Sequence, residues 1–349
     1  MRRNSLIRWI LLIGITSFSK LATAQEQVDS LRAFYIQEYP HDFFIWPVLK
    51  YRSLSFEARD RSDDNNKISF KPNNTSSFGV GFYLFEVGLE ITFAVPLGEQ
   101  QKRIFGESKA RDLQVNMLTK SWGLDVYHQK YSGFYKDDAR VKIPKNTPYP
   151  MRPDIVTRNF GVSGFYVLKH REFSLRSSYN YAERQLKRRG SFILYGTINS
   201  FKASADSAMI SSTSRIGFGE GADFEDLQYT TLSIAPGYSY NFILKKFFVN
   251  GTLTVGPAHQ WVQYQTEVGA RHYDVSFNAT YSLRLAIGYN SDRVFGGLGL
   301  VLQTRAVEFE DIHFENTSNT ARILIGYRFK ERGVLQKRVW DFIPFLKGS

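Results

Sequence analysis

The stretch that decides the fold is DVSFNATYSLRLAIGY, residues 274–289. Its odd positions are all apolar or aromatic, and its even positions are all small, polar or charged. This two-residue period is the side-chain period of a β-strand. The run is also much longer than the roughly 5–6 residues usual for strands in soluble domains. The odd face therefore needs an apolar partner along the whole length of this strand. That partner is either a protein core or lipid.

The first 24 residues have the pattern of a secretory signal peptide. Residues 2–8 carry three arginines, residues 9–15 are apolar, and Ala22-Thr23-Ala24 is a small-residue cleavage site. We therefore expect a mature chain that begins at Gln25 and leaves the cytoplasm. The alternative is an uncleaved anchor, but its apolar run is shorter than the roughly 20 residues of a spanning helix.

The composition favours a membrane barrel over a soluble domain. Mean hydropathy is −0.30, but only alternate residues of a barrel strand face lipid, so hydropathy averages miss such proteins. The chain holds 20 Tyr and 29 Phe, more than a soluble core needs, and they suit lipid-facing bands and interfacial girdles. The absence of cysteine excludes disulfides and thiolate metal sites, and no cofactor is expected.

The basic net charge of +12 narrows the choice of partners. The sequence has no basic helix or nucleic-acid motif, so we expect no nucleic-acid partner. A basic surface that faces outer-membrane lipid and lipopolysaccharide is the favoured interpretation, with envelope proteins as further candidate partners.

Other runs repeat the alternation, among them residues 78–84, 87–95, 230–242 and 321–329. Short turns alternate with long polar loops, which is typical of outer-membrane barrels. The predicted long loops are 59–69, 97–109, 132–157 and 203–227. We predict an all-β fold: an antiparallel transmembrane barrel of about 12 strands, with 10–14 left open.

The predicted organisation is a signal peptide at 1–24, a periplasmic leader at 25–43, a barrel at 44–330 and a tail at 331–349. Asp29 or Ser30 is placed to cap a short helix in the leader, which is then a linker or a partial plug. A four-residue turn at 169–172 is expected to lead into a strand at 173–181. The aromatic tail either packs on the barrel rim or binds a partner.

Several segments resemble the landmarks of one family. They are Phe70-Lys71-Pro72-Asn73, Leu124-Asp125, Gln129–Tyr135, Gly190-Ser191-Phe192 and Pro236-Gly237-Tyr238. In order and spacing they are similar to a Bacteroidetes outer-membrane family known as domain of unknown function 4421, over roughly 40–330. The resemblance implies a barrel in a Gram-negative outer membrane, and it supplies no activity, ligand or catalytic residue.

Alternation also predicts which charges point into the lumen. A Lys or Arg on the lipid face costs about 2–4 kcal/mol near the midplane, so inward placement is expected. The expected lumen charges are Glu90, Asp112, Asp125, Arg176, Arg284, Arg305, Arg322 and Arg328. They either form a constriction selective for anionic solutes or pair across a small lumen and fill it, and the second interpretation is favoured.

The predicted loop 132–157 mixes aromatic and basic residues. Aromatic rings stack on sugars and cations meet phosphate or uronate groups, so a glycan or lipopolysaccharide contact is one hypothesis. A solvated external loop is the favoured alternative. The candidate ligand residues are Tyr135, Lys136, Arg140, Lys142, Lys145, Tyr149 and Arg152.

Catalysis receives little support from the sequence. His128 with Asp125 and Ser132 is the nearest approach to a triad, but His128 and Asp125 differ in strand parity. The chain has no nucleophile elbow, HExxH or phosphate loop. The leading hypothesis is a narrow or plugged outer-membrane channel or a structural subunit of an envelope assembly. A barrel hydrolase or acyltransferase acting on lipid or glycan is the alternative.

Overall fold

The computed structural model describes residues 30–40, 42–74, 76–84, 87–269 and 271–330. The predicted signal peptide and the predicted tail lie outside the described residues. The first third of the described chain holds α2 (Ser30–Tyr35), β1 (Ile36–Glu38), β2 (Asp42–Asp60), β3 (Lys67–Lys71), β4 (Ser76–Leu84), β5 (Val87–Ala94), α3 (Glu99–Phe105) and β6 (Lys109–Leu118).

The remaining elements are longer. They are β7 (Trp122–Asp138), β8 (Met151–Val167), α4 (Arg176–Tyr179), β9 (Glu183–Gln185), β10 (Arg189–Ser204), the 3-10 turn η1 (Ser212–Ser214), β11 (Phe224–Leu244), β12 (Phe247–Thr266), β13 (Arg271–Asn290), β14 (Val294–Phe309) and β15 (Ile312–Lys330). Among the described residues, no helix is long and apolar enough to cross a membrane.

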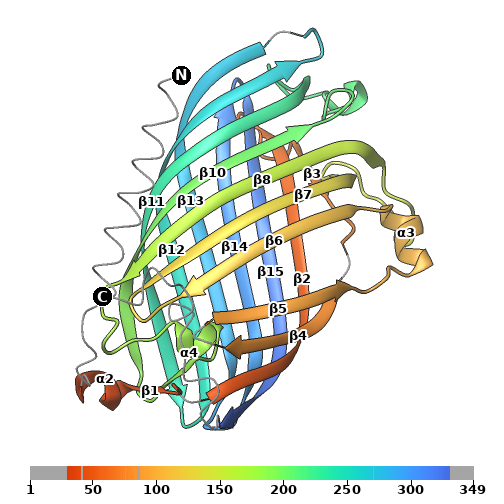
Figure 1. The fold of residues 1–349 in the computed structure, drawn as a ribbon. Coiled ribbons are helices and arrows are strands. Elements are labelled where there is room, and N and C mark those ends of the chain that lie inside the picture. Colours follow the sequence, from red (N-terminus) through yellow and green to blue (C-terminus); the bar gives the residue numbers. More distant parts are fainter. Residues whose placement is uncertain (1–29, 41, 75, 85–86, 270, 331–349) are drawn as a thin grey trace, which may run out of the picture.

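The strands form a closed antiparallel barrel (Figure 1). Neighbours in sequence pair from β10 to β15, β15 pairs back onto β2, and β3 joins β2 to β7. Among the described residues, ten strands close this ring: β2, β3, β7, β8 and β10 to β15. The number lies at the low end of the predicted range, and a count of 12 is not confirmed.

Three shorter strands extend the wall without completing it. β4 pairs with β2 and β5 pairs with β4, whereas β6 pairs with β7. In the described part of the chain, no ladder joins β5 to β6, so each has one unpaired edge (Figure 1). We call this interruption the β5–β6 seam. Lipid cannot hydrogen-bond the free backbone groups at such edges, which makes the seam unusual for a barrel wall.

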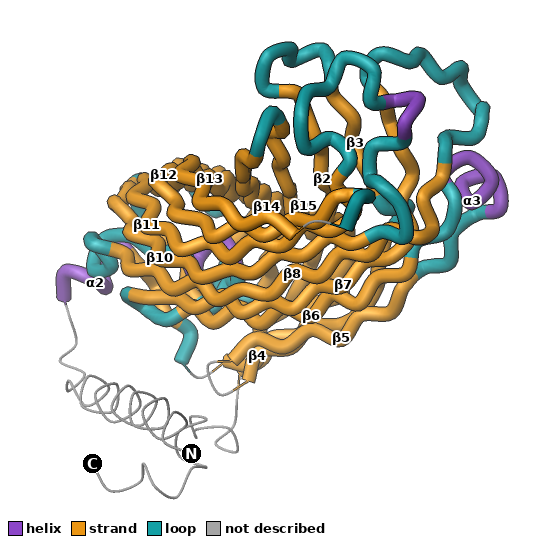
Figure 2. The backbone as a smooth tube through the Cα atoms, turned by 90° about the horizontal axis from the view of Figure 1, so that it is seen from above, coloured by secondary structure: helices purple, strands orange, loops and turns teal. Residues whose placement is uncertain are grey.

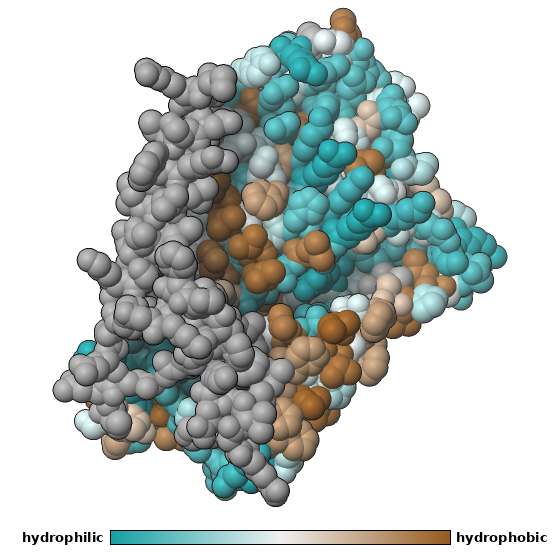
Figure 3. Space-filling model, viewed as in Figure 1, coloured by the Kyte–Doolittle hydropathy of each residue, from teal (hydrophilic) through white to brown (hydrophobic). Residues whose placement is uncertain are grey.

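The outer face carries the apolar alternation. In β13 Val275, Phe277 and Ile287 are exposed, whereas Ser276, Arg284 and Ala286 are buried. The same pattern appears in β10 and β11, and brown apolar residues gather in the middle and lower part of the visible face (Figure 3). β2 differs, because its apolar even residues, such as Phe44 and Phe56, point inward. Alternation therefore located the strands, but in β2 the more apolar face is the core face.

The barrel has two unlike ends. We call the end with the long connections the loop end, and the end with the 245–246 and 291–293 turns the terminal end (Figure 2). The predicted loop 132–157 is shorter than expected, because β7 reaches Asp138 and β8 begins at Met151. The loop at 205–223 folds back over the loop end, and its Met209 and Ile210 are fully buried.

The terminal end is closed by an internal plug, which corrects the strand predicted at 173–181. Residues 173–185 fold inward as α4 and β9, and β9 pairs with β1 of the leader. Phe173, Tyr179 and Tyr181 pack with wall residues of β2 and β14 in an apolar cluster. In a strand the adjacent Ser177 and Ser178 would point to opposite faces, whereas both are buried here with hydrogen-bond partners. We call residues 30–38 together with 173–185 the plug.

Candidate functional site

The candidate site is a layer of charged and polar side chains in the middle of the lumen. It lies between the apolar cluster at the loop end and the plug cluster at the terminal end. We call it the lumen belt, and its charged members are Lys50, Arg52, Glu90, Asp112, Asp125, Arg284, Arg305 and Arg322. Six of these residues were predicted to face the lumen.

Asp125 on β7 and Arg284 on β13 form an ion pair across the barrel. Their Oδ2 and Nη2 atoms are 2.5 Å apart, and both side chains are almost completely buried. Asn116 of β6 donates a 2.7 Å hydrogen bond to the other Asp125 oxygen. The guanidinium also lies over the rings of Phe165 and Tyr195. The pair is thus anchored to four strands of the wall and to β6 beside the seam.

Glu90 on β5 is the centre of a second group. It accepts a 2.8 Å hydrogen bond from Trp46 Nε1 and pairs with Lys50 and Arg322. The indole of Trp46 lies against Gly81 of β4, where an added Cβ would come within 2.1 Å of the ring. Arg322 also donates to the backbone carbonyl of Tyr179, so this group connects the wall to the plug.

Asp112 on β6 is the centre of a third group. Gln129 and the hydroxyl of Tyr131 each donate a 2.7 Å hydrogen bond to its Oδ2 atom. Arg52 of β2 donates a 3.1 Å hydrogen bond to the backbone carbonyl of Asp112. An amide chain continues from Gln129 through Asn159 to Asn199, each link 2.7 Å long. The side chain of Arg52 therefore connects β2 to β6. In the described part of the chain β6 pairs only with β7, so Arg52 contacts it beside its unpaired edge.

Arg305 on β14 is placed differently. Its Nη2 atom donates a 2.8 Å hydrogen bond to the Tyr127 hydroxyl, which also accepts one from Asn199. Among the described residues it forms no ion pair, although Arg52, Arg284 and Arg322 each face a carboxylate. Beside it lies a cavity of about 30 Å³. Side chains therefore fill the belt closely around Arg305, next to this small cavity.

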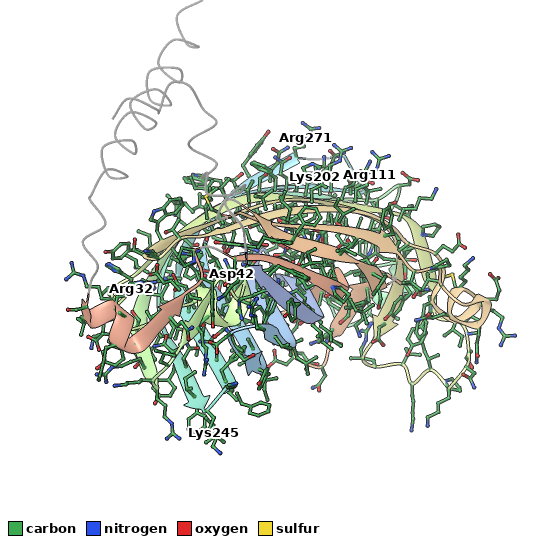
Figure 4. All side chains as sticks on the ribbon, turned by 60° about the horizontal axis from the view of Figure 1, so that its bottom comes forward. Arg32, Asp42, Arg111, Lys202, Lys245 and Arg271 are labelled. Atoms are coloured by element: carbon green, nitrogen blue, oxygen red, sulfur yellow. The ribbon has the colours of Figure 1, made fainter. Side chains whose placement is uncertain are left out.

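The two remaining predicted arginines, Arg176 and Arg328, hold the plug. Arg176 does not stand on a wall strand as predicted: it lies on α4 and contacts Glu183 and the Tyr83 hydroxyl. Arg328, on β15, is fully buried and donates to the carbonyls of Ser291 and Tyr181. Glu183 also pairs with Arg32 of α2, at 2.7 Å. Figure 4 shows Arg32 on the ribbon of α2, away from Lys245, which projects from the β11–β12 turn.

The basic residues predicted to contact glycans divide into two sets. Lys136, Arg140 and Arg152 hold the folded loop at 205–223: Lys136 binds the Ser214 hydroxyl, Arg140 the Ser214 and Ile216 carbonyls, and Arg152 the Ala208 and Met209 carbonyls. Lys142 and Lys145 are exposed. Tyr135 and Tyr149 pack with Phe105 of α3 in one aromatic cluster.

The catalytic group considered in the sequence is not assembled. His128 is exposed on the outer face of β7, whereas Asp125 is buried in the lumen and paired with Arg284. Within the described ranges, no three His, Asp or Glu side chains are placed to hold a metal ion.

Lys50 and Arg52 also face the lumen, although they were not among the predicted lumen charges. Both occupy even positions of β2, as do the buried Trp46, Leu54 and Phe56. This shared parity was the sequence signal that could have placed both side chains in the lumen. Glu183 was also missed, because its role depends on a plug that no periodicity reveals.

Comparison with known proteins gives a family but no activity. The family model described as Domain of unknown function (DUF4421) matches residues 27–329. No curated protein matches the chain. The solved structures to which it is similar include the Escherichia coli outer membrane protease OmpT, with 11% identity, a TM-score of 0.37, and coverage of 84% of this chain and 98% of that one.

A second similar structure is the translocator domain of the Neisseria meningitidis autotransporter NalP. It has 10% identity and a TM-score of 0.30, and the match covers 90% of this chain and 98% of that one. A third is Ail, the attachment invasion locus protein of Yersinia pestis, with 12% identity, a TM-score of 0.23 and coverage of 60% and 97%. These values are too low to transfer a function.

Proposed function

The chain belongs to the DUF4421 family, and we propose that it is a plugged outer-membrane β-barrel that does not conduct in its resting state. The outer-membrane location is supported by the signal-peptide pattern and by the outward apolar residues on most wall strands. A Bacteroidetes source and contact with lipopolysaccharide stay predictions of the sequence.

One observation carries the closed state: three successive layers fill the lumen. The loop-end cluster contains fully buried rings from opposite walls, including Phe70, Phe201 and Phe314. The lumen belt follows, with the Asp125–Arg284 ion pair across the barrel and the Glu90–Arg322 pair between β5 and β15. The plug fills the terminal end. A conducting pore needs a continuous water path, and each layer interrupts it independently.

Planar-bilayer recording tests this proposal with the full-length mature protein. We expect no steady conductance from the wild type. A variant with a loosened plug, Glu183→Ala, should also stay closed, because the loop-end cluster remains. Steady ion-conducting openings of the pure wild-type protein would overturn the closed-barrel proposal. Detergent-dependent extraction and heat-modifiable gel migration test the membrane barrel itself, and solubility without detergent would count against it.

A second candidate, a structural subunit of an envelope assembly, is favoured by the seam. Free edges of β5 and β6 can add an extended strand of a partner through main-chain hydrogen bonds. Ile91 and Val115 mark the outer faces of these two strands and are both strongly exposed. An envelope partner that pairs with either edge would satisfy backbone groups that lipid cannot.

Photocrosslinking in intact cells distinguishes this role from that of an isolated barrel. A photoreactive residue is placed at Ile91 or Val115, and the control is Ile198. Ile198 is similarly exposed, but its strand β10 is paired on both sides. A protein adduct of one defined mass at Ile91 or Val115, and none at Ile198, would support the subunit role. Identical adducts at all three positions, or no adduct at Ile91 and Val115, would contradict the subunit role.

A further inference from the structure

We propose that the cavity beside Arg305 binds one small inorganic anion, of the size of a halide. Arg305 is 4% exposed, so its positive charge lies almost entirely out of water. Burying a charge is costly unless it is paired or hydrogen-bonded. In the described part of the chain its side chain makes one hydrogen bond, to the Tyr127 hydroxyl, which offsets only part of that cost.

The unsatisfied groups around the cavity are of one kind. Arg305 Nη1, the Tyr195 hydroxyl and the Ser282 hydroxyl are buried without a hydrogen-bond partner, and all three residues line the cavity. A guanidinium N–H can only donate, and hydroxyls donate as readily as they accept. The cavity lining includes no carboxylate, and several of its other residues are Ser or Thr. A converging set of donors around an unpaired cation is the arrangement that an anion requires.

The size of the cavity limits the ligand. Its volume of about 30 Å³ exceeds the roughly 10–15 Å³ that one water needs. A monatomic anion fits this space, whereas a sugar or an organic phosphate does not. Chloride is the natural candidate by this chemistry, and bromide is its heavier analogue for detection. The site is independent of the closed-barrel proposal, since it concerns a bound ion and not passage through the lumen.

The neighbouring ion pairs explain why the site forms at Arg305 and not elsewhere in the belt. Arg284, Arg322 and Arg52 each have a carboxylate within 4 Å, so an added anion there would meet negative charge. Both Nη atoms of Arg328 are already used, because they donate to the Ser291 and Tyr181 carbonyls and the Asn290 side chain. Only the Arg305 guanidinium, among these lumen arginines, combines a free Nη atom with an adjacent space.

The test uses the full-length mature protein refolded in detergent. Crystals are soaked in bromide, and thermal unfolding is measured in sodium chloride and in sodium gluconate of equal ionic strength. We expect a bromide anomalous peak at Arg305 Nη1 and a higher Tm in chloride, since gluconate is too large for the cavity. Arg305→Gln should lose both effects. The matched control Arg322→Gln removes an arginine that is paired with Glu90 and should keep both effects.

Two outcomes would overturn the proposal: wild-type maps with only water in the cavity, or a chloride dependence of Tm that Arg305→Gln retains. If Arg305→Gln does not refold, the wild-type bromide map decides the question alone. Conductance in bilayers plays no part in this test, so its result and that of the closed-barrel test are separable.

Discussion

Asp125 and Arg284 meet at 2.5 Å in the centre of the lumen although 159 residues separate them in the chain. The two strands that carry them, β7 and β13, are not neighbours in the sheet. The pair therefore ties opposite parts of the wall together, and its contribution to stability can be measured.

Arg284→Ala should lower the free energy of unfolding by about 3–5 kcal/mol, because it leaves the buried Asp125 carboxylate without its cation. Urea unfolding of the refolded protein measures the change. Adding Asp125→Asn should recover part of the loss, since the uncompensated charge is then gone. Lys142→Ala, at an exposed loop position, is the control and should stay within about 0.5 kcal/mol of wild type. Equal losses from Arg284→Ala and Lys142→Ala would contradict the inward placement of the charge.

Glu183→Ala should loosen the plug, because it leaves Arg32 and Arg176 without their buried carboxylate. The cost of about 3–5 kcal/mol corresponds to opening that is more frequent by on the order of a hundredfold or more. The chain has no cysteine, so Ser178→Cys supplies a single buried thiol whose maleimide labelling rate reports the opening. Glu172→Ala removes a more exposed acid from the same connection and should leave the rate unchanged. A plug that labels equally slowly in both variants would show that Glu183 does not hold it.

Arg152→Ala should release the loop at 205–223 from the loop end. The Arg152 guanidinium donates to the carbonyls of Ser207, Ala208 and Met209, and each hydrogen bond to a charged donor is worth about 1.5–3 kcal/mol. Limited proteolysis should then cut within this loop at least several times faster than in wild type. Lys145→Ala, which changes an exposed lysine of the neighbouring loop, serves as the control. An unchanged cleavage rate in Arg152→Ala would show that Arg152 does not hold this loop. Arg152 would then again be a candidate for contact with a glycan.

Acidification should loosen the same loop. The hydrogen bonds that Arg140 donates hold the pKa of Asp138, the last residue of β7, below its ordinary value of 3.8. A lowered folded-state pKa stabilises the fold fully above the unfolded-state pKa, and this contribution is lost as the pH falls through the folded-state value. Arg140 also donates to the carbonyls of Ser214 and Ile216, so protonation of Asp138 weakens the anchor that positions Arg140 against the loop at 205–223.

A spin label at Ser212→Cys reports the mobility of this loop by electron paramagnetic resonance. We expect a transition to higher mobility below about pH 4, which Asp138→Asn should abolish because its loop is already mobile at neutral pH. An Asp138→Asn variant with the wild-type transition would assign the acid effect to other carboxylates.

The sequence predicted the strands of the barrel wall. Inside the barrel it predicted the inward charges on wall strands but not the plug. The strands around Val275, Ile234 and Ile323 were located correctly, because a two-residue period is a local property that each strand carries by itself. Inward placement also followed for Arg284 and Arg322, since it needs only parity. The segment from Phe173 to Tyr181 misled the prediction: its alternation fits a strand, but a short turn of α4 buries it more completely inside the lumen.

The sequence by itself determined that long strands alternate an apolar face with a polar one, because that pattern follows from backbone geometry alone. Only the tertiary structure decided which polar residues meet: Asp125 with Arg284, Glu90 with Lys50, and Arg305 with the Tyr127 hydroxyl. These encounters depend on the number of strands in the ring, on their stagger and on the infolded plug. Each of these is set by ring closure over the whole chain, so residues distant in sequence become neighbours only when the barrel is complete.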